Sequence, residues 1–137
     1  MFRHIIIFCF NMIFNLSHRH YIKSTLRSHL TFTKANHVLF AYGKKTTIRL
    51  GHKKYKYGPL TITVNGTPNY LFNLEIFKVI KKRFGDLTEA DAVLDGFIRL
   101  SELKAELQRC YGRPINPTEP ISQIFIRHYK IKGSAQL

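Results

Sequence analysis

A short run of basic and polar residues in the first half of the chain has the composition of a binding or catalytic site. It lies between two glycines, Gly43 and Gly51, and its reactive side chains are Lys44, Lys45, Thr47 and Arg49. Lysine and arginine bind phosphate groups. A threonine hydroxyl becomes a nucleophile only when a base lies within hydrogen-bonding reach, and a lysine is such a base only when its pKa is lowered. The run therefore fits either an anion-binding site or a site that cleaves an amide.

The charge of the chain indicates what such a site binds. The protein has 137 residues and a formal net charge of +14, and no Asp or Glu precedes Glu75. An uneven positive field raises the local concentration of polyanions and speeds their encounter with the surface. We therefore expect a nucleic acid as partner, above all RNA or a nucleoside. A membrane surface is the second expectation.

A second basic segment supports the same expectation. Its lysines alternate with tyrosines, so that phosphate contacts would stand beside rings on which bases stack. The alternative is that the tyrosines are core residues and the lysines only keep the protein soluble. We predict an RNA-binding surface formed by Lys44, Lys45, Arg49, Lys53, Lys54, Tyr55, Lys56 and Tyr57.

The amino-terminal segment is treated separately from the rest. Residues 5–14 are apolar apart from one Asn, but the run is shorter than the roughly 20 residues of a spanning helix. We expect residues 1–29 to be an extension that is disordered or translated from an early start codon, and a membrane anchor to be the less favoured reading. Residues 30–132 are the predicted domain, and 133–137 a tail.

The remaining composition excludes several kinds of protein. The two cysteines, Cys9 and Cys110, lack metal-ligand spacing, and none of the histidines is spaced as a ligand set. We therefore expect no metal, no cofactor and a reducing, cytoplasmic setting. A monomer is expected.

Local patterns predict a mixed fold. Alternating β-branched residues indicate strands, Thr33 and Thr88 are helix-capping residues, glycines end helices, and Asn65-Gly66 is a hairpin turn. Strands are predicted at 30–32, 46–50, 60–64, 70–83 and 121–131, and helices at 33–43, 88–95 and 101–109. For residues 72–80 a helix is the open alternative, because the periodicity fits both. This is an α+β class, a small barrel or curved sheet of about five strands with helices packed at its rim.

The ordered series of short motifs resembles the ASCH domain family, in particular its archaeal-type members. The resemblance covers about Leu30 to Tyr129, and the motifs that carry it are Gly43-Lys-Lys-Thr-Thr-Ile-Arg-Leu-Gly51, Tyr57-Gly58, Leu87-Thr-Glu-Ala-Asp-Ala92, Asp95-Gly-Phe97, Leu100-Ser-Glu-Leu-Lys104 and Tyr111. It implies a β-barrel like that of the pseudouridine synthase and archaeosine transglycosylase (PUA) domain. It also implies a cleft between the lysine-threonine loop and the Asp-Gly-Phe helix end, and RNA binding.

One bacterial branch of this family hydrolyses acetylcytidine with a lysine, a threonine and a carboxylate. By resemblance these roles fall on Thr47, on Asp95, which replaces a glutamate, and on either Lys44 or Lys45, because the glycine-to-threonine spacing is one residue shorter here. Two interpretations stay open. The site hydrolyses an acylated nucleoside, or it only binds RNA, with the lysines on phosphates and Asp95 paired with a lysine or with Arg49.

Overall fold

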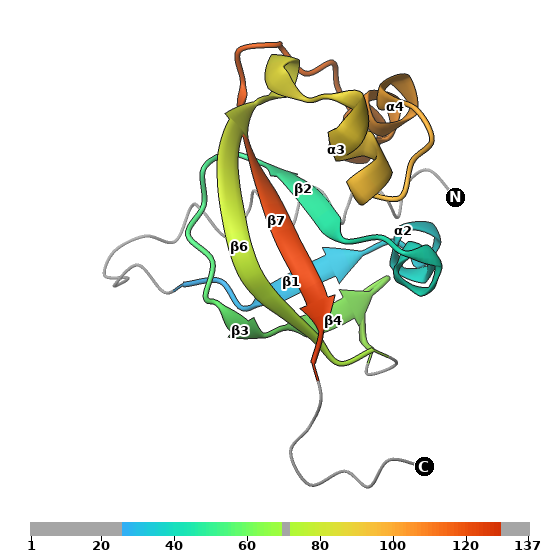
Figure 1. Ribbon diagram of the computed structural model, residues 1–137, viewed down its shortest axis with the longest axis vertical. Coiled ribbons are helices and arrows are strands. Elements are labelled where there is room, and N and C mark those ends of the chain that lie inside the picture. The colour runs from blue at the N-terminus through green and yellow to red at the C-terminus, as the bar shows by residue number, and fades with distance from the viewer. Residues whose placement is uncertain (1–25, 70–71, 130–137) are drawn as a thin grey trace, which may run out of the picture.

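A computed structural model describes residues 26–69 and 72–129 (Figure 1). Its elements, in chain order, are β1 (His29–Phe32), α2 (Lys34–Val38), the 3₁₀ helix η1 (Leu39–Tyr42), β2 (Thr46–Leu50), β3 (Gly58–Pro59), β4 (Thr61–Val64), β5 (Thr67–Pro68), β6 (Leu74–Arg83), the 3₁₀ helix η2 (Phe84–Asp86), α3 (Glu89–Leu94), α4 (Leu100–Tyr111) and β7 (Pro120–His128). The predicted α+β class is confirmed.

The strands form two sheets. One has the order β1-β4-β5, with β1 and β4 parallel, and the other has the order β2-β7-β6-β3, in which all pairs are antiparallel. Five of the seven described strands have four residues or more. The predicted barrel is not closed within the described residues, because β3 and β5 are two-residue strands at sheet edges and no strand pairing joins the two sheets.

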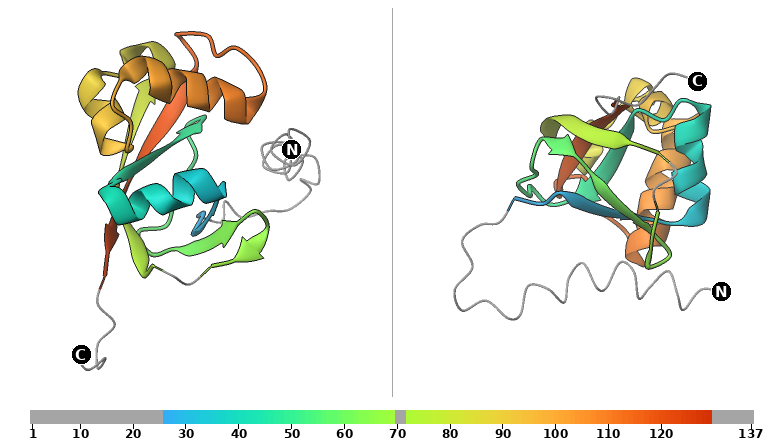
Figure 2. Two further views of the ribbon diagram at one scale, coloured as in Figure 1. Left: turned by 90° about the vertical axis from the view of Figure 1, so that its right-hand side faces the viewer. Right: turned by 90° about the horizontal axis from the view of Figure 1, so that it is seen from below.

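Two apolar cores hold the sheets and helices in place. The first lies between the sheets and contains Leu30, Phe32, Ile62, Ile76, Ile124 and Ile126 among others. The second lies beneath α3 and α4, which cover the end of the four-stranded sheet where β6 ends and β7 begins (Figures 1 and 2). Leu103 and Leu107, predicted on one helix face, are both buried there.

Local signals determine where the helices begin and end. The Thr33 hydroxyl accepts the N–H of Asn36, and the helix that starts there continues as η1 to Gly43, which has a φ of 97°. α3 begins with a capping box in which Thr88 and Asp91 satisfy each other's backbone N–H groups. These ends direct two loops toward each other, the one at Lys44 and the one at Asp95.

The long strand differs from its predicted bounds. β6 begins at Leu74, whereas Tyr70 and Leu71 lie outside the described residues. Its register against β7 shifts between Ile76 and Lys78, which makes Phe77 the extra residue of a β-bulge. The bulge produces the bend that β6 shows in Figure 1.

Strand pairing begins ahead of Leu30. Arg27 forms a parallel bridge with Tyr55, and His29 opens β1. Residues 1–25 of the predicted extension, including Cys9, and the whole of the predicted tail, 133–137, lie outside the described residues. Among the described helices none has the length and hydropathy needed to cross a membrane.

Candidate functional site

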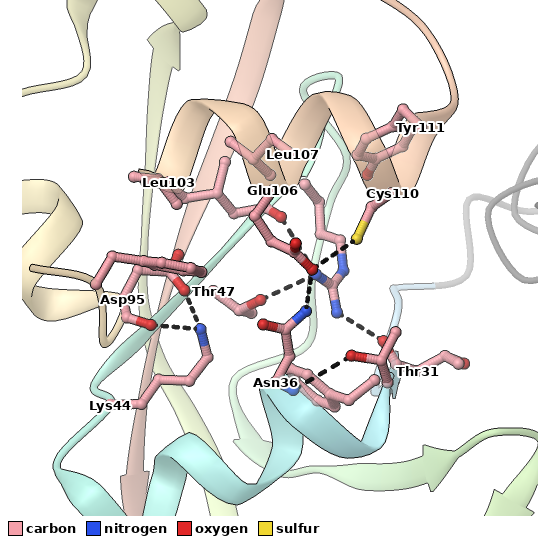
Figure 3. A pocket seen from close by; sticks show the side chains of 15 residues that line it. Thr31, Asn36, Lys44, Thr47, Asp95, Leu103, Glu106, Leu107, Cys110 and Tyr111 are labelled. Atoms are coloured by element: carbon pink, nitrogen blue, oxygen red, sulfur yellow. Dashed lines mark hydrogen bonds and ion pairs between the residues drawn. The ribbon is translucent and has the colours of Figure 1, made fainter. Parts of the chain in front are cut away.

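A pocket opens between the two sheets and helix α4 (Figure 3). The centres of water-sized groups can occupy about 80 Å³ of it, which is room for several such groups. Its walls come from β1 and the start of α2, the loop before β2 and β2 itself, the end of α3, and α4. The lining residues are Thr31, Phe32, Thr33, Asn36, Lys44, Thr47, Ile48, Arg49, Asp95, Phe97, Leu103, Glu106, Leu107, Cys110 and Tyr111.

Lys44 and Asp95 form a buried ion pair at one end of the pocket. The Lys44 side chain is 2% exposed and that of Asp95 5%, and the Lys44 amine also donates to the backbone oxygen of Asp95 at 2.8 Å. Lys45, by contrast, is exposed, and its backbone N–H donates to the oxygen of Leu94 at 2.7 Å. Lys44 is therefore the lysine that faces the cleft. The alternative in which Asp95 pairs with Arg49 is wrong.

The surroundings of Lys44 favour its neutral form more than water does. Burial lowers the pKa of its amine well below the ordinary value, and the nearby Arg49 guanidinium lowers it further. The ring of Phe40 lies 5.7 Å from the amine. A lysine in this environment can accept a proton, provided that Asp95 does not hold it in the charged form.

Thr47 and Arg49 lie side by side on β2. Arg49 Nη1 donates to the Thr47 hydroxyl oxygen at 2.9 Å, and its Nη2 donates to the backbone oxygen of Thr31 at 2.8 Å. The guanidinium also lies 5.0 Å from the Phe32 ring centroid. Because a guanidinium cannot accept a proton, this contact positions the Thr47 hydroxyl without activating it.

The opposite wall was not predicted from the sequence. Glu106 of α4 accepts hydrogen bonds from Asn36 Nδ2 at 3.0 Å and from Arg109 Nε at 2.7 Å. Burial alone would raise the pKa of Glu106, but the hydrogen bonds from Arg109 and Asn36 lower it, so the group is a carboxylate at neutral pH. A signal was present in the sequence. Glu106 lies on the helix face that buries Leu103 and Leu107, where an acidic residue needs a partner.

The formal charges inside the pocket balance. Two cations, Lys44 and Arg49, face two carboxylates, Asp95 and Glu106. The net +14 of the chain therefore lies elsewhere. The described residues contain no group of three or more His, Cys, Asp or Glu side chains placed to hold a metal ion.

The lysine-tyrosine segment only partly forms the predicted surface. Lys54 and Lys56 are exposed, and Tyr57 is 57% exposed, with its hydroxyl accepting the N–H of Val79 at 3.1 Å. Tyr55 is 6% exposed. The prediction that its ring stacks bases is wrong, because its strand bridge with Arg27 turns the ring into the core between the sheets.

Lys53 interacts electrostatically with Arg49, which lines the pocket. Burial, followed by Arg27 and Arg49, lowers its pKa to about 8. It still carries a positive charge at neutral pH. The segment thus offers three cations, Lys53, Lys54 and Lys56, and one exposed ring.

Comparison with known proteins identifies the fold. No family model matches the sequence, and no curated protein is significantly similar to it. The crystal structure of the ASCH domain from Lactobacillus crispatus JV V101 is similar over 92% of this chain and 94% of that chain, with a TM-score of 0.58 and 14% identity. Protein EF3133 from Enterococcus faecalis V583, which carries the family label DUF984, is similar over 94% and 90%, with a TM-score of 0.54 and 12% identity. The chain has the fold of an ASCH domain, as its motifs predict.

Proposed function

We propose that the protein binds RNA and takes one unpaired nucleoside into the pocket, with neighbouring phosphates on the lysine-tyrosine segment. The observation that carries this proposal is the composition of the pocket. It combines apolar walls with balanced, well-positioned polar groups, in a chain whose formal net charge is +14. Sequence-specific recognition of RNA usually targets unpaired bases in this manner.

The pocket suits an uncharged, flat ligand. Phe97, Leu103 and Leu107 supply apolar contact area, and the Asn36 amide and Glu106 carboxylate supply an acceptor-rich edge. A phosphate inside would meet the carboxylates of Asp95 and Glu106 at close range, which opposes its binding. A base or ribose meets no such cost.

The phosphates are better placed outside. Lys54 and Lys56 are exposed beside Tyr57. Positive side chains that neutralise phosphates release counterions, so affinity falls steeply as salt rises. Binding to a single-stranded oligoribonucleotide should therefore be strongly dependent on salt.

A pair of adjacent threonines tests the pocket. Thr47→Val removes the hydroxyl that Arg49 contacts, whereas Thr46→Val alters the neighbouring buried threonine, which does not line the pocket. In filter binding at low salt, Thr47→Val should weaken binding about three- to tenfold, the cost of one hydrogen bond. Thr46→Val should bind as the wild type does. Equal affinities for all three proteins would end the proposal for the pocket.

A second candidate function is hydrolysis of an acetylated nucleoside such as acetylcytidine. The observation in its favour is that a buried lysine with a lowered pKa, Lys44, lines the same pocket as the Thr47 hydroxyl. In such a reaction the Thr47 oxygen would attack the acetyl carbonyl, its proton would pass through a base to the departing amine, and water would release acetate from the threonine ester. We rank binding above hydrolysis because Arg49, a donor, occupies the Thr47 hydroxyl oxygen.

Incubation with acetylcytidine separates these two functions. Chromatographic detection of cytidine above the uncatalysed background would establish hydrolysis. Thr47→Ala should abolish that turnover while leaving the buried ion pair intact, and the neighbouring Thr46→Ala, which does not line the pocket, is its matched control. Absence of turnover in the intact protein, with nucleoside binding retained, would leave binding as the function.

A further inference from the structure

Strand β7 carries a second surface that the pocket does not use. On one of its faces Ile124 and Ile126 point into the core between the sheets. On the other face Ile121 and Gln123 lie under the helices, where Gln123 donates to Asp91 of α3 at 3.0 Å. Farther along this second face the helices no longer cover the strand, and Phe125 and Arg127 follow, with Arg127 exposed.

Two rings and two cations meet on this uncovered part of the sheet. Phe77, the bulge residue of β6, is 37% exposed and packs edge-on against Phe125, with ring centroids 6.1 Å apart. The Arg127 guanidinium lies 4.7 Å from the Phe77 centroid, and the Lys78 amine lies 5.3 Å from that of Phe125. We call these four residues, Phe77, Lys78, Phe125 and Arg127, the sheet platform.

The bulge is what makes the sheet platform possible. In regular pairing a single residue of β6 would stand opposite each residue of β7. Here Lys78 is opposite Phe125, Ile76 is opposite Ile126, and Phe77 is added between them. Both a ring and a cation of β6 therefore reach the region around Phe125. Glu75 holds Arg127 in place through a hydrogen bond of 2.7 Å.

We propose that the sheet platform binds a second segment of the same single-stranded RNA, stacking bases on its rings and arginine and placing a phosphate on Lys78. This inference rests on the proposed function of the pocket. Aromatic rings next to basic side chains are the recurrent means of holding single strands, because every base has a π-face. A guanidinium that already lies on a ring can stack a base on its other side.

The sheet platform and the pocket are linked through β2. Thr46 pairs with Phe125, and Thr47 pairs with Ile124, so consecutive residues of β2 lie beside the sheet platform and in the pocket. Lys45 immediately precedes them and is exposed. A strand that places one nucleoside in the pocket can therefore continue past Lys45 onto the sheet, over a positively charged path.

The test compares a long and a short ligand. Binding of a 12-nucleotide single-stranded oligouridylate and of the nucleoside alone is measured with the full chain and with Phe77→Leu, Phe125→Leu and the double variant. Leucine keeps apolar volume but removes the ring. Each single variant should bind the oligonucleotide about five- to tenfold more weakly, as expected for one lost stacking contact. Nucleoside binding should not change.

Two controls separate stacking from altered packing and from bulk charge. Phe125→Tyr alters the same position but keeps a ring, so it should bind the oligonucleotide within about twofold of the wild type. Lys78→Gln should weaken binding of the oligonucleotide and reduce its salt dependence. Arg99→Gln removes an exposed cation on the helical side of the protein, and it should change neither the affinity nor the salt dependence.

The proposal for the sheet platform is overturned if Phe77→Leu and Phe125→Leu bind the oligonucleotide as tightly as the wild type does. If Thr47→Val still weakens binding in that case, the pocket proposal survives alone. If the ring variants weaken binding and Thr47→Val does not, the sheet platform binds RNA and the pocket proposal fails. A general loss of folding is detected by circular dichroism on each variant.

Discussion

Lys44 and Asp95 are 51 positions apart and form a buried ion pair that joins the loop before β2 to the end of α3. Removing one partner of a buried pair leaves an unpaired charge in an apolar setting, which typically costs about 3–5 kcal/mol. The pair therefore fixes one end of the pocket. Loss of either residue should affect folding before it affects any ligand.

We expect Lys44→Met to lower the free energy of unfolding by about 3–5 kcal/mol, because Asp95 then lies buried without its cation. The double variant Lys44→Met with Asp95→Asn should recover part of this loss, since it removes both charges. Urea denaturation followed by circular dichroism measures both values. The exposed Lys45→Met should stay within about 0.5 kcal/mol of the wild type. Equal effects at positions 44 and 45 would contradict the assignment of the buried lysine.

Gly96 is the second residue on which this end of the pocket depends. Its φ is 94°, and an added Cβ would lie 3.3 Å from two side-chain atoms of Leu39 and 3.6 Å from the Cβ of Lys44. Gly43 has nearly the same φ, 97°, but an added Cβ there meets nothing within 4 Å. Both Ala variants carry the cost of a left-handed backbone, about 1–2 kcal/mol.

Gly96→Ala should therefore lower the free energy of unfolding more than Gly43→Ala does. The difference measures the crowding of the added methyl group against Leu39 and Lys44. We expect a difference of about 1 kcal/mol or more from the crowding. It should be visible as a lower melting temperature in differential scanning calorimetry. If Gly43→Ala proves to be the more harmful change, the close approach of Gly96 to Leu39 is wrong.

Asp91 makes the stability of the protein depend on pH in the acidic range. It accepts hydrogen bonds from Lys82 and Gln123 and from the backbone N–H of Thr88. Burial alone would raise the pKa of Asp91, but these hydrogen bonds prevail and lower it below the ordinary value of 3.8. A carboxylate with a lowered pKa stabilises the fold above its unfolded pKa, and this contribution is lost as pH falls through the folded pKa.

The contribution of Asp91 to the free energy of unfolding should accordingly be constant near neutral pH and decline below about pH 4. Asp91→Asn should be less stable at pH 7 and should show a shallower decline in acid. Some decline should remain in this variant, because the pKa of Glu106 is also lowered. Urea titrations between pH 2.5 and 7 provide the measurement, and an unchanged acid slope in Asp91→Asn would speak against the network around α3.

Several features of this fold were predictable because neighbouring residues determine them. Thr33 and Thr88 begin helices through their own side chains, and Asn65-Gly66 forms its turn with positive φ at both residues. The choice between Lys44 and Lys45 was not predictable. Consecutive residues of a loop point in different directions, and only the packing of α3 against that loop determines which one meets Asp95.

The errors share a physical origin. Tyr55 was predicted to be exposed from its alternation with lysines, but a bridge to Arg27, far along the chain, turned it inward. Asn36 and Glu106 were missed because they are 70 positions apart and meet only across the pocket. The bulge at Phe77 was likewise invisible, since it depends on the register between β6 and β7. Contacts between distant segments, rather than local propensity, account for each case.

Cys110 offers a direct readout of the pocket. Its thiol lines the wall, is partly buried and donates to Glu106 at 3.4 Å. A ligand in the pocket should shield it, so alkylation by iodoacetamide should slow several-fold when a nucleoside is bound. Peptide mass spectrometry resolves the Cys110 peptide from the one that contains Cys9. Glu106→Gln should weaken the protection, and a rate of Cys110 modification that saturating nucleoside leaves unchanged would place the ligand elsewhere.

The last prediction concerns the basic segment and distinguishes phosphate contacts from pocket contacts. Lys54→Gln and Lys56→Gln remove exposed cations, and each should reduce the slope of log affinity against log salt by up to about 0.7, the value for one phosphate contact on a single strand. Thr47→Val removes no charge, so it should lower affinity while leaving the slope unchanged. Filter binding between 50 and 300 mM salt gives both quantities. If Lys54→Gln and Lys56→Gln leave the slope unchanged, the phosphates lie on another surface. The sheet platform variant Lys78→Gln, measured in the same series, would then show whether that surface is the uncovered face of β6 and β7.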